Sequence, residues 1–482
     1  MAILDQYGTP IQGRLVEAAK RQLNRKYEPV TLGDWDDLLP ETDWQTLVSL
    51  SNRLYSNFGI IKGAIDQKAS YAVGKAWHPI FGGRDGEWGA LAKAWLEDFY
   101  RICDVRGGVF NLQTDLYLYS LSIDITGDAF VLLTESETGY PQIQSIPSHK
   151  IGNRPNQTAI TKGAYKGLKC KKGIVYNRKQ RAVGYQVLGA DAKGSQDVVI
   201  SARDMIHVFD PSYTDQSRGI PIISHGITEL RDIKESSRRE LLAQVLLSSV
   251  SFIETNESGG NENPIASLYG DNSNTASAGT GVTSATYEEG MVRHFQANSG
   301  GKLETIKNDR PGVNWESFQT RCLRNVLAGV GWPLALVSEP EGQGTADRAE
   351  LAKAEKAVED RQSVLQPVAL KIVSYALAKA IERGDLPFNA DFAKWSFTLP
   401  KRISIDFGRE MKARIDEYTA GFSTLEEVVG LNGKQFTDHI DRRIAEHVAI
   451  LEKLKQVEDS TGFKINPSDI VGNISNPTTQ PQ

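Results

Sequence analysis

The fold is decided by residues 311–383, which run PGVNWESFQTRCLRNVLAGVGWPLALVSEPEGQGTADRAELAKAEKAVEDRQSVLQPVALKIVSYALAKAIER. Their first part predicts a helix, because Asn314 can cap it and Gly331 and Pro333 can end it. Apolar residues recur there at helical spacing and predict one buried stripe, formed by Phe318, Cys322, Leu323, Val326 and Val330.

A loop and a long second helix follow. The loop covers Leu334 to Gly344, and Thr345 can cap a helix that continues to about Arg383. Pro367 lies inside this helix, where proline removes one backbone hydrogen bond and bends the axis, so we expect a kink. Charges of both signs alternate over 346–361, beside a narrow stripe of alanines. Two interpretations stay open: a solvated helix held by ion pairs four residues apart, or a helix that packs against its copy in a neighbouring subunit.

The composition is that of a soluble globular protein. The chain has 482 residues, and 40% hydrophobic against 24% charged residues excludes wholesale disorder. No apolar run approaches the ~18 residues that cross a bilayer, and no signal-peptide pattern opens the sequence, so we expect an intracellular protein without a membrane partner. Three widely separated cysteines argue against a disulfide framework or a zinc site, and Cys322 is expected in the core.

The formal net charge of −5 argues against a protein that grips DNA. Proteins hold DNA by neutralising phosphates with Lys and Arg, so they are basic at least locally. Any contact with DNA should therefore be loose. One stretch does gather basic residues, and it predicts either a solvated face or a contact surface for nucleic acid or an acidic protein: Lys162, Lys166, Lys169, Lys171, Lys172, Arg178, Lys179 and Arg181.

The first half of the chain changes from helices to strands. Residues 1–44 form a polar leader with a possible helix, Arg14–Arg25, and an acidic turn at 34–37. Helical patterns cover 43–71, interrupted near Asn57, and 87–101. A β-rich region of about 90 residues with mostly antiparallel connections follows, with strands predicted beyond Gly127–Asp128 and at 140–146, 173–176, 184–188, 198–200 and 205–209.

The pattern then returns to helices. Ile223, Ile227, Leu230 and Ile233 have helical spacing, and the apolar run 241–253 is expected to be buried or to lie at a subunit interface. Residues 291–296 and 302–306 predict a small hairpin that carries a long loop rich in Gly, Ser and Asn. A strand-like arm, two or three amphipathic helices and a disordered tail at 461–482 complete the chain.

No motif for catalysis is present in the sequence. There is no phosphate-binding G-x-x-x-x-G-K-[ST], no G-x-S-x-G and no H-E-x-x-H. Gly342-Gln-Gly344 lacks the βαβ context of a dinucleotide loop. His439 and His447 are eight residues apart and are expected to be surface histidines. We therefore predict no active site, no metal and no cofactor.

Five blocks of sequence together resemble the portal proteins of tailed bacteriophages and prophages, in the lambda-like branch. They are RLYSNFGIIKGAIDQKASYAVGKAWHPIF (53–81), ITGDAFVLL (125–133), DMIHVF with the following RGIP (204–221), NWESFQTRCLRNVLAGVGWPLALVS (314–338) and RISIDFGREMKARIDEYTAGFSTLEEVVGLNG (402–433). Val326, Leu327, Phe407 and Gly408 depart from the family pattern.

The resemblance implies an α+β portal fold with named parts. These are an N-terminal arm (1–44), the first part of a wing (45–219), stem helix 1 (220–255), a clip (256–310), stem helix 2 (311–331), a tunnel loop (332–344), a long kinked wing helix (345–395), an α-helical crown (396–460) and the tail (461–482).

It also implies a function without catalysis. Such proteins form a closed ring, commonly of twelve subunits, at one capsid vertex of the virion, where double-stranded DNA is packaged and ejected. The implied partners are the large terminase, the major capsid or scaffolding protein and a head–tail adaptor, with assembly in the host cytoplasm. The alternatives are a smaller head–tail adaptor or capsid protein and a metal-dependent nucleic-acid enzyme.

The resemblance assigns roles to particular residues. Pro367 would kink the long helix. The contacts that close the ring are expected from the alanine stripe of the long helix and from 241–253. The DNA-facing tunnel loop would present Leu334, Leu336, Val337, Ser338, Glu339, Glu341 and Gln343; the stem would use Leu241, Leu242, Arg321 and Arg324; and the clip would dock partners through Asn256, Arg293, Lys302 and Lys307.

Overall fold

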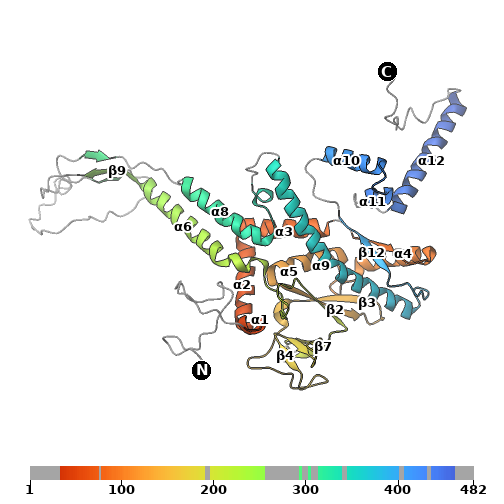
Figure 1. Cartoon of the computed structure of the whole chain (residues 1–482), viewed down its shortest axis with the longest axis horizontal. Helices are drawn as coiled ribbons and strands as arrows, with labels where there is room; N and C mark the ends of the chain where they lie inside the picture. Colours follow the sequence, from red (N-terminus) through yellow and green to blue (C-terminus); the bar gives the residue numbers. More distant parts are fainter. Residues whose placement is uncertain are drawn as a thin grey trace, which may run out of the picture. The chain divides into compact units, whose positions relative to one another are not determined.

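The computed structural model describes residues 33–74, 77–189, 196–255, 293–295, 302–304, 313–338, 345–400, 407–430 and 436–461, and its fold is α+β as predicted (Figure 1). The chain divides into two compact units. One contains Met1–His225 and Leu327–Gln482, and the other contains Gly226–Val326. The predicted leader helix and the tail at 462–482 lie outside the described residues.

The first unit begins with helices α1 (Trp35–Leu38), α2 (Glu41–Asn57) and α3 (Gly59–Val73). The break near Asn57 is confirmed, and Gly74 ends α3 with a φ of 58°. The acidic turn expected at 34–37 is wrong. It is the short helix α1, and Asp36 is buried there against the Lys172 ammonium, at 2.8 Å.

Two further helices, α4 (Gly86–Ile102) and α5 (Leu112–Thr126), are each capped by a side chain at the N-terminus. Asp85 accepts a hydrogen bond from the Trp88 amide at 3.0 Å, and Asn111 accepts one from the Thr114 amide at 2.9 Å. These caps satisfy backbone donors that have no partner within the helix. The sequence predicts α4 correctly but does not predict α5.

A three-stranded sheet with the order β3-β2-β8 forms the centre of this unit. Its antiparallel strands are β2 (Asp128–Glu135), β3 (Pro141–Ile146) and β8 (Met205–Phe209). Side chains on β2 alternate between the two faces of the sheet. Ala129 and Val131 belong to the large helical core, whereas Phe130 packs against a second sheet. Both faces are therefore covered.

The second sheet is antiparallel, with the order β4-β5-β6-β7. Its strands are β4 (Lys169–Lys171), β5 (Ile174–Tyr176), β6 (Ala182–Val187) and β7 (Val198–Ser201), and the short 3-10 helix η2 (Ser148–Lys150) precedes them. The predicted β-rich region with its antiparallel connections is confirmed.

The long helix α9 (Thr345–Arg383) contains Pro367, as predicted, and contributes much of the helical core (Figure 1). Core residues on it include Leu365, Ile372 and Leu377. A two-stranded antiparallel sheet of β1 (His78–Phe81) and β12 (Trp395–Thr398) contacts this helix through β12.

The N-terminal half of α9 packs partly against its own chain. Ala354 and Arg361 are buried within the same chain. A wholly solvated helix over 346–361 is therefore wrong, and Ala354 is not available to a neighbouring subunit. The exposed Lys356 and Asp360 do form the expected pair four residues apart, at 2.8 Å.

One expectation about membranes also needs correction. Residues Arg348–Arg383 are long and apolar enough, by length and composition, to cross a bilayer, although the sequence predicts no such stretch. Of the apolar window in this helix, 44% is buried inside the protein. Because Leu365, Ile372 and Leu377 fill the core, packing accounts for their apolar character.

The second unit contains two long helices, α6 (Ile227–Ser249) and α8, which extends beyond the unit (Val313–Val330). They run antiparallel, because Trp315 Nε1 donates to Ser236 Oγ at 2.9 Å while Asn325 Nδ2 donates to Glu229 Oε2 at 2.8 Å. The helix predicted from the spacing of Ile227, Leu230 and Ile233 is confirmed as α6, and these three residues are buried. The 3-10 helix η3 (Ile222–Gly226) precedes α6.

Three predictions for this unit are wrong, namely the cap at Asn314, the burial of Phe318 and the hairpin. Helix α8 begins at Val313, so Asn314 lies inside it, and Phe318 is exposed rather than part of the buried stripe. The apolar run 241–253, expected to be buried or to lie at a subunit interface, divides between α6 and strand β9 (Val250–Thr255). Leu241 and Leu242 in it are exposed, so the interface stays a prediction. Strands β10 (Arg293–Phe295) and β11 (Lys302–Glu304) flank β9 on either side instead of pairing with each other as a hairpin.

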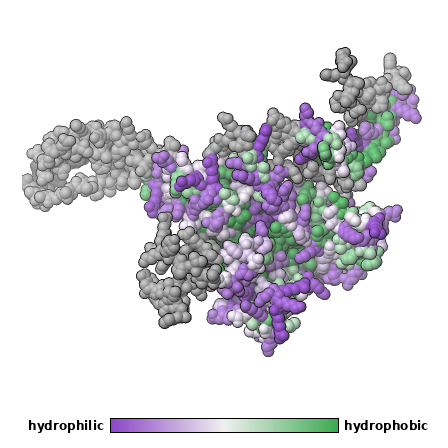
Figure 2. Space-filling view, viewed as in Figure 1, coloured by the Kyte–Doolittle hydropathy of each residue, from purple (hydrophilic) through white to green (hydrophobic). Residues whose placement is uncertain are grey.

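The described C-terminal part consists of α10 (Phe407–Thr419), α11 (Leu425–Gly430) and α12 (Phe436–Thr461). Helix α12 has apolar side chains on its surface, as Figure 2 shows, and they include Ile444, Val448 and Leu451. His447 is exposed on the same helix and His439 is partly exposed, which agrees with the prediction of surface histidines.

Candidate functional site

No catalytic constellation was found among the described residues. No group of three or more His, Cys, Asp or Glu side chains there could hold a metal ion. Two open cavities measure about 350 and 370 Å³. The first is lined largely by apolar side chains such as Leu133 and Met205, and in the second Arg154 pairs with Asp197 at 2.8 Å.

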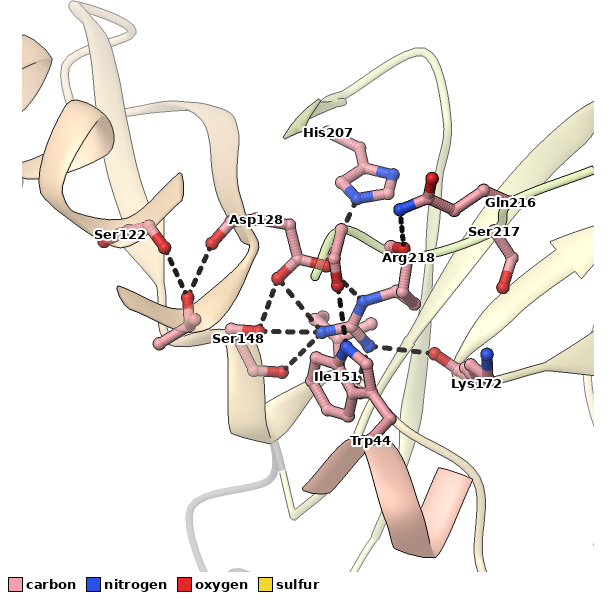
Figure 3. A network of polar contacts seen from close by, with 12 residues as sticks. Trp44, Ser122, Asp128, Ser148, Ile151, Lys172, His207, Gln216, Ser217 and Arg218 are labelled. Atoms are coloured by element: carbon pink, nitrogen blue, oxygen red, sulfur yellow. Dashed lines mark hydrogen bonds and ion pairs between the residues drawn. The ribbon is translucent and has the colours of Figure 1, made fainter. Parts of the chain in front are cut away.

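The strongest polar feature is a buried ion pair between Arg218 and Asp128 (Figure 3). Asp128 begins β2 directly after Gly127, and Arg218 immediately precedes Gly219. Arg218 Nη2 also donates to the Ser148 carbonyl at 3.0 Å, and Nη1 donates to the Ile151 carbonyl at 2.8 Å. The guanidinium thus joins β2, η2 and the segment before η3, and its five N–H donors suit this branched arrangement.

Aromatic rings complete the enclosure of Arg218. Its guanidinium carbon lies 4.2 Å from the Trp44 ring centroid and 4.9 Å from that of Phe130. Trp44 also donates through Nε1 to the Gly219 carbonyl at 2.8 Å. A cation over aromatic faces is stabilised by their quadrupoles, so burial of this charge is compensated on several sides.

The protonation states in this network follow from burial and charge. Burial alone would raise the pKa of Asp128, but Arg218 and His207 outweigh it and lower the pKa to about 2. Burial lowers the pKa of His207, which is stacked on Phe130 at 4.4 Å between ring centroids. Asp128 is therefore ionised and His207 neutral at neutral pH.

Backbone packing requires glycine at two positions beside this ion pair. Gly127 has a φ of 94°, and a Cβ there would lie 2.4 Å from the Gly219 carbonyl carbon. A Cβ on Gly219 would lie 1.7 Å from the Gly127 carbonyl oxygen. The sequence blocks GDAF and RGIP, which are far apart in the chain, therefore meet through their glycines and their charged residues.

A second buried cluster joins three helices. Asp124 on α5 accepts hydrogen bonds from Lys68 on α3, at 3.3 Å, and from Arg361 on α9. Burial lowers the pKa of Lys68, an effect that Asp124 opposes and Arg361 reinforces. Gln362 Nε2 adds a hydrogen bond to the Ala72 carbonyl at 3.1 Å, so the adjacent residues Arg361 and Gln362 connect α9 to α5 and to α3.

A third cluster contains two carboxylates and one cation. Arg106 Nη2 lies 2.8 Å from Asp104 Oδ2 and 2.7 Å from Asp115 Oδ1, and both carboxylates are buried. Burial, followed by the charge of Asp104, raises the pKa of Asp115 to about 7. The paired Asp104 has a lowered pKa, because its hydrogen bonds with Arg106 outweigh the effect of burial.

The C-terminal end of α8 determines the start of the predicted tunnel loop. Gly331 has a φ of 73°, and the Trp332 amide donates to the Leu327 carbonyl at 3.1 Å while the Gly331 amide donates to the Ala328 carbonyl at 3.1 Å. These two bonds form a Schellman motif, which ends the helix and turns the chain. Trp332 is then buried, and the 3-10 helix η4 (Leu334–Leu336) follows Pro333.

Four of the seven predicted tunnel-loop residues can be located. Leu334, Leu336 and Val337 are partly exposed and Ser338 is exposed. Glu339, Glu341 and Gln343 lie outside the described residues. The role assigned to this loop stays a prediction.

The predicted stem and clip residues are spread over the second unit. Leu241 and Leu242 are 62% and 58% exposed on α6, and Arg321 and Arg324 are exposed on α8. Arg293 and Lys302 begin β10 and β11, whereas Asn256 and Lys307 lie outside the described residues. Their roles in assembly and docking stay predictions.

The basic stretch of the second sheet is mostly, but not wholly, a solvated face. Lys172 is buried against Asp36, and Lys171 Nζ lies 3.8 Å from the same carboxylate. The remaining members are exposed: Lys162, Lys166, Lys169, Arg178, Lys179 and Arg181. Cys103, Cys170 and Cys322 are all buried and free, as predicted for Cys322.

Some residues of these sites were not predicted from sequence. Trp332 had a usable signal, because an apolar residue directly after a helix-ending glycine is typical of a Schellman motif. The pairing of Arg218 with Asp128, and of Lys68 and Arg361 with Asp124, had none, since their partners are distant in the chain.

Comparison with known proteins gives the class of the chain. A family model described as phage portal protein, lambda family, matches residues 23–362. This family consists of structural proteins of phages. Because the match covers more than half of the sequence, the chain belongs to the lambda family of phage portal proteins. The search of curated proteins found no match.

Two solved structures are also similar to this chain. The neck of a native gene transfer agent particle, computed with C12 symmetry, is 13% identical, with a TM-score of 0.46, and the alignment covers 80% of this chain and 93% of that one. An HK97-family phage portal protein from Corynebacterium diphtheriae is 12% identical, with a TM-score of 0.31 and coverage of 72% and 94%. Membership of the family rests on the family model alone.

Proposed function

We propose that this chain forms a ring-shaped channel at a capsid vertex, through which double-stranded DNA is packaged and ejected. The observation that carries the proposal is the match of the lambda portal family to residues 23–362. Such a ring would place the protein in the virion, after assembly in the host cytoplasm. No observation favours a smaller adaptor or a metal-dependent nuclease as a second function.

The charge of the chain supports a channel that does not grip DNA. The net charge is −5, and no Lys or Arg occurs between Arg324 and Arg348. Each phosphate that a protein neutralises adds salt-dependent affinity, which would slow sliding. In this proposal, the segment 332–344 faces the DNA, with Glu339 and Glu341 repelling the phosphates.

Exposed apolar side chains on the long helices support contacts between subunits. Leu241 and Leu242 on α6 are largely exposed, as is Phe318 on α8. A closed ring needs two different surfaces of each subunit to meet, and apolar side chains at such a contact would lose water on assembly. We assign these residues to the contact between neighbouring stems.

The partners follow from the same proposal. The segment 256–310 would form the clip, where the large terminase docks during packaging and a head–tail adaptor docks later. The major capsid or scaffolding protein would contact the outer part of the ring. Residues Asn256, Arg293, Lys302 and Lys307 are the docking candidates.

Electron microscopy of the purified full-length protein, combined with light scattering, tests the proposal. We expect rings with a central hole and a mass of about twelve chains. Because ring closure can need a partner, the measurement is repeated with co-expressed capsid or scaffolding protein. A compact monomer under both conditions, at high concentration, contradicts the proposal.

A further inference from the structure

The segment that follows α8 is attached to α3, a helix from a distant part of the chain. Trp332 is the attachment point, since it is 1% exposed and its Nε1 donates to Gln67 Oε1 at 3.1 Å. The Trp332 ring also stacks on Tyr71, with 5.9 Å between ring centroids. One indole thus contacts two residues that share a face of α3, four positions apart.

Two further contacts join the same pair of segments. Lys68 Nζ approaches the Val330 carbonyl at 3.5 Å, at the end of α8. Farther along, a Cβ placed on Gly63 would lie 3.0 Å from Val337 Cγ1, so the absence of a side chain lets Val337 approach the helix. The segment 330–337 is therefore held by α3 at its beginning and again after η4.

Helix α3 is suited to be a fixed support. Ile61, Ala64, Ile65 and Ala69 on it are completely buried. Lys68 and the Ala72 carbonyl connect it to α5 and α9 through Asp124, Arg361 and Gln362. A helix that is packed in the core and is also bonded to two other helices moves less than a partly exposed segment that it holds.

We propose that α3 sets the position of the segment 332–338, with Trp332 as the positioning residue and Gln67 as its acceptor. This inference rests on the proposed function in one respect only, namely that the segment lines a DNA channel. The segment would then keep its place relative to α3 rather than follow movements of α8.

Hydrogen exchange measured on the purified full-length protein tests the attachment directly. Trp332→Phe keeps an aromatic ring but removes the donor, and Gln67→Leu removes the acceptor. We expect each to speed exchange of amides in 332–338 about tenfold, as the loss of one partly buried hydrogen bond predicts. Gln67→Glu keeps an acceptor oxygen and should restore exchange close to the wild-type rate.

A matched control is available on α4. Trp88 Nε1 donates to the Pro387 carbonyl at 2.7 Å, so Trp88→Phe loses an equivalent hydrogen bond. It should leave exchange in 332–338 unchanged. If Trp332→Phe and Gln67→Leu also leave it unchanged, or if Trp88→Phe speeds it equally, the inference is overturned.

Gly63→Val supplies an independent variant, because its side chain must displace Val337. We expect faster exchange at Val337 and Ser338, and unchanged exchange there would likewise contradict the inference. DNA packaging by assembled Gln67→Leu rings separates the two proposals. Faster exchange with normal packaging keeps the attachment to α3 and rejects the DNA-facing role, whereas faster exchange with reduced packaging supports both.

Discussion

Arg218 and Asp128 form a fully buried ion pair between segments 90 residues apart. Arg218 reaches Asp128 from the RGIP block, and Asp128 belongs to the GDAF block at the start of β2. The same contact brings Gly127 and Gly219 together. Two of the blocks by which the chain resembles its family are therefore in direct contact in the structure.

Removing one partner of the Arg218–Asp128 ion pair should strongly destabilise the protein. We expect Arg218→Ala to lower the free energy of unfolding by about 3–5 kcal/mol, because Asp128 would remain buried without its counter-charge. Chemical denaturation measures the change. The control is Arg203→Ala, since Arg203 is 89% exposed beside Asp204 and should change stability by less than ~0.5 kcal/mol. Equal losses in the two variants would contradict this account.

The glycine contact predicts a second effect on stability. Gly127→Ala should destabilise the protein by more than ~1 kcal/mol, because φ is positive and a Cβ would overlap the Gly219 carbonyl. Thermal unfolding provides the measurement. Gly86→Ala is the matched control, since a Cβ at Gly86 meets nothing within 4 Å and φ is not positive there. A neutral Gly127→Ala variant would show that this backbone can move apart.

The Asp104–Arg106–Asp115 cluster predicts that stability falls at higher pH. The pKa of Asp115 is raised from 3.8 to about 7 in the folded protein, so the folded state holds a proton that the unfolded state has lost. This contribution is fully present below pH 3.8 and is lost as pH rises toward 7.

Asp115→Asn should remove that dependence. We expect the stability of the variant relative to the wild type to be greater at pH 8 than at pH 5, by about 1 kcal/mol or more. Urea denaturation at both values tests this expectation. Asp104 has a lowered pKa and acts at more acidic pH, outside the measured interval. A difference that does not change with pH would mean that Asp115 is ionised throughout.

Charge reversal in 332–344 tests the proposed channel. Glu339→Lys with Glu341→Lys should leave ring assembly intact and impair DNA passage, because two cations at a constriction would bind phosphates. Packaged DNA per capsid is the measurement, and raising the salt concentration should partly restore it. The Glu→Gln pair is the control for loss of negative charge alone. Normal packaging by the lysine variant would show that this segment does not face DNA.

The exposed leucines on α6 predict an assembly defect. Leu241→Asp with Leu242→Asp should prevent ring formation without changing the circular dichroism of the subunit, because charges would be buried at the contact. Light scattering of the purified protein follows assembly. Leu91→Asp, at a residue 57% exposed on α4, is the control and should still form rings. Rings from the α6 variant would exclude these leucines from the contact.

Much of the helical framework could be predicted from local patterns. Helix α2 buries Trp44, Leu47, Ser51 and Leu54 at helical spacing, and Pro367 lies inside α9 without ending it. Helix α5 was missed, because it buries polar and apolar residues alike, including Asp115, Ser120 and Asp124, and so lacks a one-sided apolar pattern. The surroundings of α5 supply partners that its own sequence does not show.

Strand pairing and buried charge are the other features that sequence patterns missed. Strands β10 and β11 were located near their true positions, but pairing with β9 depends on contacts between segments distant in sequence. The basic stretch suggested a solvated face, yet Lys172 is buried because Asp36 lies opposite it. A residue type shows its charge, whereas only its neighbours in space decide whether burial is compensated.

By itself, the sequence determined the family, the α+β class, the long helix α9 and the glycine and proline that end α8, because these depend on residue type and on short-range periodicity. Tertiary structure alone decided that Asp128 meets Arg218, that Asp124 meets Lys68 and Arg361, and that Trp332 is held by Gln67. Each of these contacts joins segments separated by at least 56 residues. Such contacts arise only when the core brings distant elements together and excludes water from between them.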